Sequence, residues 1–119
     1  MTTEEIHQTL KEFSEKYKLK QEAIDSCMKA MEHCIADDSD GLGGFSIDEI
    51  RLEFMQHDLI FEHYLYNIIF VKTKIGLYQN KENPDYVKRL KPIGYYELDT
   101  NMEGDSFDDW LIIDVKKGK

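Results

Sequence analysis

The fold is decided at residues 23–45, which read AIDSCMKAMEHCIADDSDGLGGF. In the first part of this stretch, apolar side chains recur three and four residues apart, the spacing of one face of an α-helix. They are Ala23, Ile24, Cys27, Met28, Met31, Cys34 and Ile35. From residue 37 to residue 44 the periodicity stops and glycines appear, which favours a loop. The stretch therefore predicts an amphipathic helix that ends near Ala36, followed by a change of structural class.

A first helix is expected upstream, over about residues 3–17. Thr2 and Glu5 have the spacing of a capping box, in which each side chain accepts a hydrogen bond from the backbone N–H of the other residue. Apolar residues then follow at helical intervals, namely Ile6, Leu10, Phe13 and Tyr17. Two helices joined at residues 18–20 are the expected N-terminal part of the fold.

Downstream of Phe45 the pattern changes to that of strands. Apolar and polar residues alternate over 50–55, and His57-Asp58 is a plausible turn. A short helix over 47–55 fits the same residues. Residues 64–78 are rich in β-branched and aromatic side chains, which suit a half-buried sheet surface, so they predict a strand.

Two further strands are expected near the end of the sequence, at 93–98 and 110–115, with turns at 80–85 and 99–104. The run from Trp110 to Val115 is nearly continuous in apolar residues, which is typical of a strand covered on both faces. Strands joined by short turns pair antiparallel. The sequence therefore predicts an α+β fold, with two N-terminal helices packed on an antiparallel sheet of about four strands.

Composition limits the class of protein. The 119 residues fit one domain, so 1–119 is expected to fold as a unit, and 41% apolar with 12% aromatic residues is enough for a core. Cys27 and Cys34 are seven positions apart on one helix, too far apart for a disulfide, and the N-terminus lacks a signal-peptide pattern. Polar residues interrupt the apolar stretch 59–71, so it is not a membrane span. A cytosolic location is the expectation.

The formal net charge of -9 repels phosphate backbones and anionic lipid surfaces, so we expect neither nucleic acid nor membrane as a partner. The acidic residues form two blocks. The first is Asp37, Asp38, Asp40, Asp48 and Glu49, and the second is Glu97, Asp99, Glu103, Asp105, Asp108 and Asp109. Either block suits a basic partner, and either also suits a solvated loop that keeps a small protein dissolved.

The stretch 38–49 resembles the calcium loop of EF-hand proteins. It places oxygen-bearing side chains at the first, third, ninth and twelfth loop positions, and Gly43 at the sixth; the oxygen-bearing residues are Asp38, Asp40, Ser46 and Glu49. Leu42 occupies the fifth position, where the pattern normally supplies a ligand. A calcium-binding module is therefore the alternative function, although the resemblance covers only this loop.

Catalytic signatures are missing from the sequence. We find no nucleophile elbow, P-loop, zinc-protease helix motif or dinucleotide-binding glycine pattern. The histidines are scattered at positions 7, 33, 57 and 63, without the spacing of a zinc site. We therefore expect no enzymatic activity, no cofactor and no resident metal.

The pair Asp108-Asp109 precedes the single tryptophan of the chain. In a strand, Asp108 and Trp110 point to one face and Asp109 points to the other. An acid beside an exposed aromatic ring is typical of the energetic centre of a protein interface, whereas a core tryptophan after a turn fits the same letters.

Residues 92–99 (PIGYYELD) and 103–114 (EGDSFDDWLIID) resemble the C-terminal part of small acidic bacterial immunity proteins. Such proteins neutralise secreted or contact-delivered toxins in the cytosol. The resemblance implies a cognate basic toxin as the partner, for example a nuclease, blocked by acidic side chains and aromatic anchors. The residues that we expect at this interface are Asp37, Asp38, Asp40, Tyr95, Glu103, Asp105, Asp108, Asp109 and Trp110. An adaptor or oligomerising domain is a third possibility.

Overall fold

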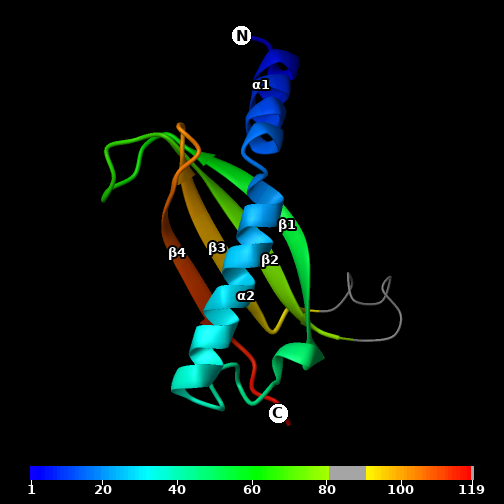
Figure 1. Cartoon of the computed structure of the whole chain (residues 1–119). Coiled ribbons are helices and arrows are strands. Elements are labelled where there is room, and N and C mark those ends of the chain that lie inside the picture. The colour runs from blue at the N-terminus through cyan, green and yellow to red at the C-terminus, as the bar shows by residue number, and fades with distance from the viewer. Residues whose placement is uncertain (81–90, 119) are drawn as a thin grey trace.

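The computed structural model describes residues 1–80 and 91–118. Two helices are followed by a 3-10 turn and a four-stranded antiparallel sheet with the strand order β1-β2-β3-β4 (Figure 1). The elements are α1 (Thr3–Lys16), α2 (Leu19–Asp37), η1 (Ile47–Glu49), β1 (Ile50–Ile60), β2 (Phe70–Gln79), β3 (Gly94–Asn101) and β4 (Ser106–Ile113). The predicted α+β fold with two N-terminal helices is confirmed.

Local interactions define where α1 starts and stops. The Thr2 Oγ1 accepts a hydrogen bond from the Glu5 backbone N–H at 3.1 Å, and Glu5 Oε1 accepts one from the Thr2 N–H at 3.3 Å. This is the predicted capping box. Lys18, between the helices, has a φ of 52°, a left-handed conformation that helices do not continue through. The chain therefore changes direction there, and α1 projects past the end of the sheet (Figure 1).

The core lies between α2 and one face of the sheet. Ala23, Cys27 and Met31 of α2 have no exposed surface. They pack against side chains of the loop after α2, of the sheet and of the residue just before β3, namely Leu42, Phe45, Ile50, Ile75, Leu77, Ile93, Tyr96 and Leu98. Burial of each large apolar side chain contributes about 1.5–3 kcal/mol. By contrast, α1 contains no buried residue, so this core does not include it.

The loop after α2 belongs to the core as well as to the surface. Leu42 is fully buried and Phe45 nearly so, which anchors the loop under the sheet. Gly43 has a φ of +70°, and a β-carbon there would lie 2.5 Å from the Val115 carbonyl oxygen. Only glycine fits this backbone conformation and this close approach.

The turn predicted at His57-Asp58 is wrong, because β1 continues to Ile60. A bulge between Phe54 and Gln56 inserts one residue, so the alternation of side chains shifts by one position. His57 then pairs with Thr73 of β2 and lies on the helix-covered side. The helix alternative over 47–55 survives only as the single turn of η1.

The strand predicted from residue 64 begins only at Phe70. Residues 61–69 form the connection between β1 and β2 instead. Within this connection, His63 stacks on Tyr64 and Tyr66 with ring centroids 4.9 Å apart in both pairs. Aromatic packing, and not strand pairing, therefore organises the first part of the predicted strand.

The C-terminal strand also differs from its prediction. β4 is an edge strand that runs from Ser106 to Ile113, and none of its residues is fully buried, so it is not covered on both faces. β3 continues to Asn101, which moves the turn predicted at 99–104 to the residues just after it. The turn predicted at 80–85 lies mostly outside the described residues.

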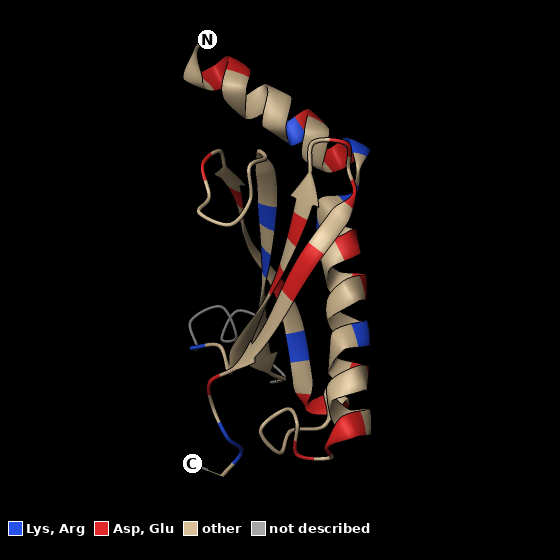
Figure 2. Cartoon of the chain, turned by 90° about the vertical axis from the view of Figure 1, so that its left-hand side faces the viewer, with Lys and Arg blue, Asp and Glu red and all other residues tan. Residues whose placement is uncertain are grey.

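Among the described residues, helices cover one face of the sheet only (Figure 2). We call the other face the open face. The strand registers place on it Arg51, Glu53, Gln56, Asp58, Lys72, Lys74, Tyr95, Glu97, Asp99, Asp108, Trp110 and Ile112.

Candidate protein-binding surface

Charged residues of the open face form a cross-strand row. Asp58 pairs with Lys72, Lys72 with Asp99, and Asp99 with Asp108. Directly paired side chains on one face lie close enough to interact. Lys72 Nζ forms an ion pair with Glu97 Oε2 at 3.1 Å, diagonally across β2 and β3. The row is therefore acidic on balance, with a lysine at its centre.

Lys72 and Lys74, the two lysines of β2 on the open face, also lie over aromatic rings. Lys72 Nζ is 5.0 Å from the centroid of the Trp110 ring, and Lys74 Nζ is 4.3 Å from that of Tyr95. Cation–π contacts of this kind contribute about 0.5–1 kcal/mol at exposed positions. Trp110 is held in place by this contact and still exposes 39% of its surface.

Asp99 is the unusual residue of the row. Only 1% of its surface is exposed, and neither carboxylate oxygen has a hydrogen-bond partner among residues 1–80 and 91–118. Burial raises the pKa of Asp99 to about 6; Asp108 and Glu97 add to the rise and Lys72 opposes it. The fold thus buries a carboxyl group at a position where its ionised form is disfavoured, which is unusual for a polar group in a native structure.

An aromatic cluster anchors loop 61–69 on the open face. The ring of Tyr66 lies 5.2 Å from that of Phe107 and 5.8 Å from that of Phe70, and Phe70 lies 5.3 Å from Phe107, all edge to face. The Tyr66 hydroxyl donates a hydrogen bond to Asp108. This hydrogen bond is the main cause that raises the pKa of Tyr66 to about 12. The loop and β4 are therefore one continuous surface.

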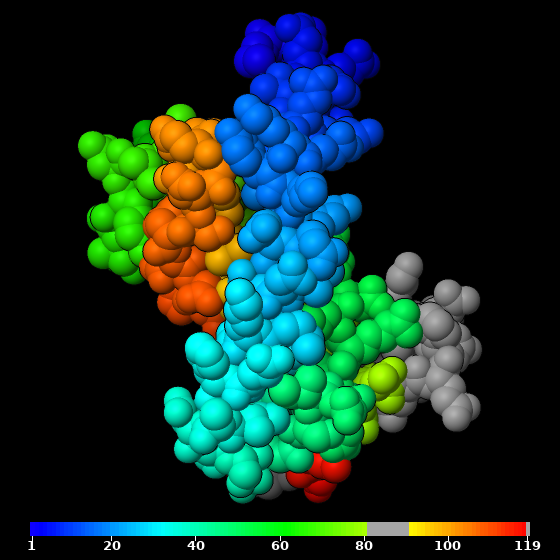
Figure 3. Space-filling model, in the orientation of Figure 1, coloured from blue at the N-terminus to red at the C-terminus, as the bar shows by residue number. Residues whose placement is uncertain are grey.

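Large apolar side chains of the loop point into solvent. We call them the loop patch: Phe61 (71% exposed), Tyr64 (90%), Leu65 (64%), Ile68 (45%) and Ile69 (47%). In Figure 3 the loop projects from the molecule beside β4. Phe107, Trp110 and Ile112 of β4 extend the exposed apolar surface, at 37%, 39% and 46%. Exposed apolar surfaces of this kind mark interaction sites.

Only part of the predicted interface comes together. Tyr95, Asp108 and Trp110 share the open face, as the alternation predicted for Asp108 and Trp110 requires. Glu103 and Asp105 follow β3, and the antiparallel order places their turn at the same end of the sheet as loop 61–69.

The other predicted interface residues lie elsewhere. Asp109 is on the helix-covered side and accepts a hydrogen bond from the Tyr96 hydroxyl at 2.7 Å. Asp37, Asp38 and Asp40 lie where α2 ends, at the opposite end of the molecule (Figure 1). Sequence reasoning missed the loop patch and Asp99. The apolar residues at 64–69 are visible in the sequence, but their composition predicts the start of a half-buried strand.

The side chains of the calcium-like loop have other partners. Lys117 Nζ lies 2.7 Å from Glu49 Oε2, and Ser46 forms a capping box with the same residue. These contacts, the one to Lys117 first, lower the pKa of Glu49. Asp38 accepts a hydrogen bond from the Asp40 N–H at 3.0 Å. Within residues 1–80 and 91–118, no group of three or more His, Cys, Asp or Glu is arranged to hold a metal ion. The calcium interpretation gains no support from this part of the chain.

Comparisons with protein-family models, curated proteins and solved structures found no match to this chain. In the described part of the chain, neither helix has the length and apolar character needed to cross a membrane.

Proposed function

We propose that this protein is an immunity-type inhibitor, which binds a basic protein toxin through loop 61–69 and the adjoining open face. The observation that carries the proposal is the loop patch, which lies beside an acidic, aromatic sheet surface. Exposure of Phe, Tyr and Leu side chains to water is unfavourable, and binding of a partner that covers them removes this cost. The acidic residues next to them select a partner of the opposite charge.

The two kinds of residue have separate tasks in this mechanism. The apolar and aromatic side chains of the loop patch and Trp110 supply the desolvated centre, where most binding energy resides. The surrounding acids, including Asp58, Glu103 and Asp105, steer a basic protein toward that centre and accelerate association. Occupation of the basic surface of the toxin then excludes its own substrate.

The test begins with the chain immobilised at low salt and exposed to lysate of its own cells. A stoichiometrically retained basic protein is then produced in a separate host, alone and together with the chain. We expect the retained protein alone to stop growth, and co-production of the chain to restore it.

The surface is tested with Leu65→Asp, which adds a charge to the loop patch at a position that is 64% exposed, so the fold is preserved. The matched control is His33→Asp, which adds the same charge on the exposed side of α2. Leu65→Asp should weaken the complex at least about 100-fold, as expected for a desolvated hot spot, and abolish protection. A retained protein that is harmless to the host, or equal effects of the two variants, would contradict the proposal.

A further inference from the structure

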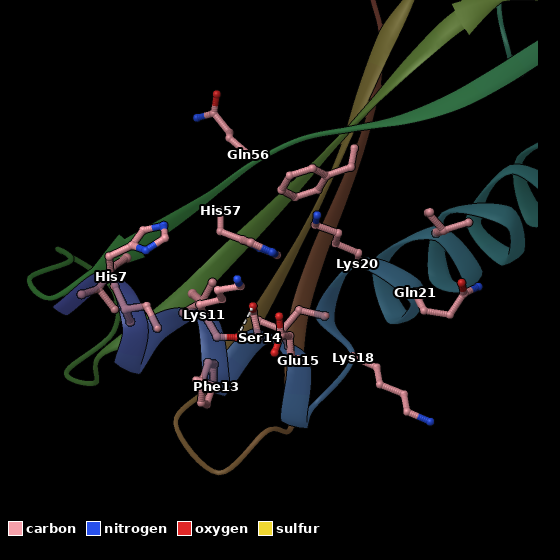
Figure 4. A pocket seen from close by; sticks show the side chains of 16 residues that line it. His7, Lys11, Phe13, Ser14, Glu15, Lys18, Lys20, Gln21, Gln56 and His57 are labelled. Atoms are coloured by element: carbon pink, nitrogen blue, oxygen red, sulfur yellow. Dashed lines mark hydrogen bonds between the residues drawn. The ribbon is translucent and has the colours of Figure 1, made fainter. Parts of the chain in front are cut away.

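A cavity separate from the loop patch lies where α1, α2 and β1 meet (Figure 4). Its volume is about 730 Å³, which is in the range of small-molecule sites. The walls are mainly apolar and come from both helices and from β1 and β2, with Leu10, Phe13, Ile24, Phe54, Leu59 and Val71 among the lining residues. The size and lining suit a ligand with an extended apolar part.

The charged residues around the cavity are mainly basic, although the whole chain is acidic. Among the described residues that line it, three are lysines, Lys11, Lys18 and Lys20, and one is an acid, Glu15. In Figure 4, Lys20 points toward the space between α2 and β1, whereas Lys18 points away from it. Lys20 Nζ lies 4.3 Å from the centroid of the Phe54 ring, so one cation is fixed at an apolar wall.

His57 supplies a second polar group in the cavity wall. Its Nδ1 lies 2.9 Å from Thr73 Oγ1, and its Nε2 is buried and has no hydrogen-bond partner in the described part of the chain. Burial first, and then Lys20, lower the pKa of His57, which favours the neutral ring. With the Thr73 hydroxyl donating to Nδ1, the proton of the neutral ring is on Nε2. The ring then presents a donor that requires an acceptor.

We propose that the cavity binds a free long-chain carboxylic acid, with the carboxylate at Lys20 and His57 and the alkyl chain along the walls from α1, Phe54 and Leu59. One ammonium and one neutral N–H match a singly charged group with two acceptor oxygens. A doubly charged phosphate requires more donors. An uncharged alkyl chain or alcohol leaves Lys20 without an opposite charge. This site is independent of the proposed inhibitor function, because it lies on the helix-covered side of the sheet.

Calorimetric titration of the full chain with dodecanoate, below its micelle concentration, tests the site. We expect one dodecanoate per chain, and dodecan-1-ol should bind at least about tenfold more weakly because it lacks the charge. Trp110 lies on the other face of the sheet, so its fluorescence should not change on binding. Equal binding of the acid and the alcohol, or no binding of dodecanoate, overturns the proposal.

Variants separate head-group recognition from general charge. Lys20→Gln and His57→Phe should each weaken dodecanoate binding about tenfold, and Lys20→Arg should retain it. Lys29→Gln makes the same charge change as Lys20→Gln on the exposed side of α2, and should have no effect. Circular dichroism melting verifies that each variant is folded. Equal losses of dodecanoate affinity for Lys20→Gln and Lys29→Gln overturn the assignment of Lys20 to the carboxylate. A dimer that dissociates on the change Leu10→Asp also overturns the proposal, because a second copy of the chain would then fill the cavity.

Discussion

At the scale of single residues, Asp99 is buried by the fold although burial disfavours the charged form of its carboxyl group. Its folded-state pKa of about 6 lies above the ordinary value of 3.8, so the folded chain binds a proton that the unfolded chain has released. Stability therefore falls as the pH rises from about 4 to above 6, where the buried group must carry its charge. Asp99→Asn removes that charge and should raise the free energy of unfolding at pH 8 by about 1–3 kcal/mol.

Urea denaturation of wild type and Asp99→Asn at pH 4, 6 and 8 measures this difference. It should shrink toward zero at pH 4, where the folded wild type is already protonated. The matched control is Asp105→Asn, which removes the same charge from an exposed turn and should change stability by less than about 0.5 kcal/mol at each pH. A stability gain of Asp99→Asn that is the same at pH 4 and pH 8 would show that ionisation is not its cause.

Side-chain orientations in the candidate site follow from the sequence, whereas the burial of Asp99 does not. The opposite orientations of Asp109 and Trp110 follow from the two-residue period of any strand, so they were predictable. The burial of Asp99 was not, because it accompanies the packing of loop 61–69 on the open face. The contact that ties this loop to β4, from Tyr66 to Asp108, spans 42 positions. No local pattern in the sequence records such a contact.

At the scale of elements, the β3–β4 turn is fitted against the end of α1. Gly104 has a φ of +87°, and a β-carbon there would lie 2.1 Å from the Tyr17 ring. Gly104→Ala must therefore displace Tyr17 in addition to straining the backbone. Gly44 is the matched control, because its φ is +90° and its nearest contact would be an ordinary 3.5 Å to Lys117. We expect Gly104→Ala to cost about 1–3 kcal/mol more than Gly44→Ala in thermal or urea unfolding.

A double variant isolates the contact with Tyr17. In the background of Tyr17→Ala, the added methyl group meets no ring, so the extra cost of Gly104→Ala should disappear. Equal costs of Gly104→Ala with and without the ring would mean that backbone strain alone explains the loss.

Elements were predictable where their signal is local. Both helices have apolar periodicity, and α1 has its capping box, so their bounds were close to those observed. The strands differed where a tertiary feature overrides composition. The bulge at Met55 carries β1 through the predicted turn, and the exposed aromatic and apolar residues at 64–69 have the composition of a half-buried strand. Composition indicates which residues favour a sheet and not whether a partner strand is present.

At the scale of the whole molecule, acidic residues that look equivalent in the sequence are separated. The first acidic block lies where α2 ends, and the turn with Glu103 and Asp105 lies at the loop 61–69 end of the sheet. A flat partner therefore reaches only one of the two groups. The sequence predicts the excess of negative charge, but the order of the strands determines which acidic residues lie at the same end of the molecule.

In the molecule as a whole, α1 lies apart from the core of the fold. Its side chains are at most partly buried, and it packs beside the N-terminal end of α2 without entering the core. Removal of residues 1–16 should therefore lower the free energy of unfolding by less than about 2 kcal/mol. Met31→Ala, a change of one fully buried residue, should cost about 2–5 kcal/mol. Urea denaturation compares the two variants directly.

Dodecanoate binding should rank these two variants in the opposite order. The shortened chain loses the wall that contains Leu10 and Phe13, so it should remain folded and lose dodecanoate affinity. Met31→Ala leaves every wall of the cavity in place, so it should keep its affinity under conditions where it is still folded. A shortened chain that unfolds more easily than Met31→Ala would place α1 within the cooperative core. A shortened chain that is folded and still binds dodecanoate would show that α1 is not part of the site.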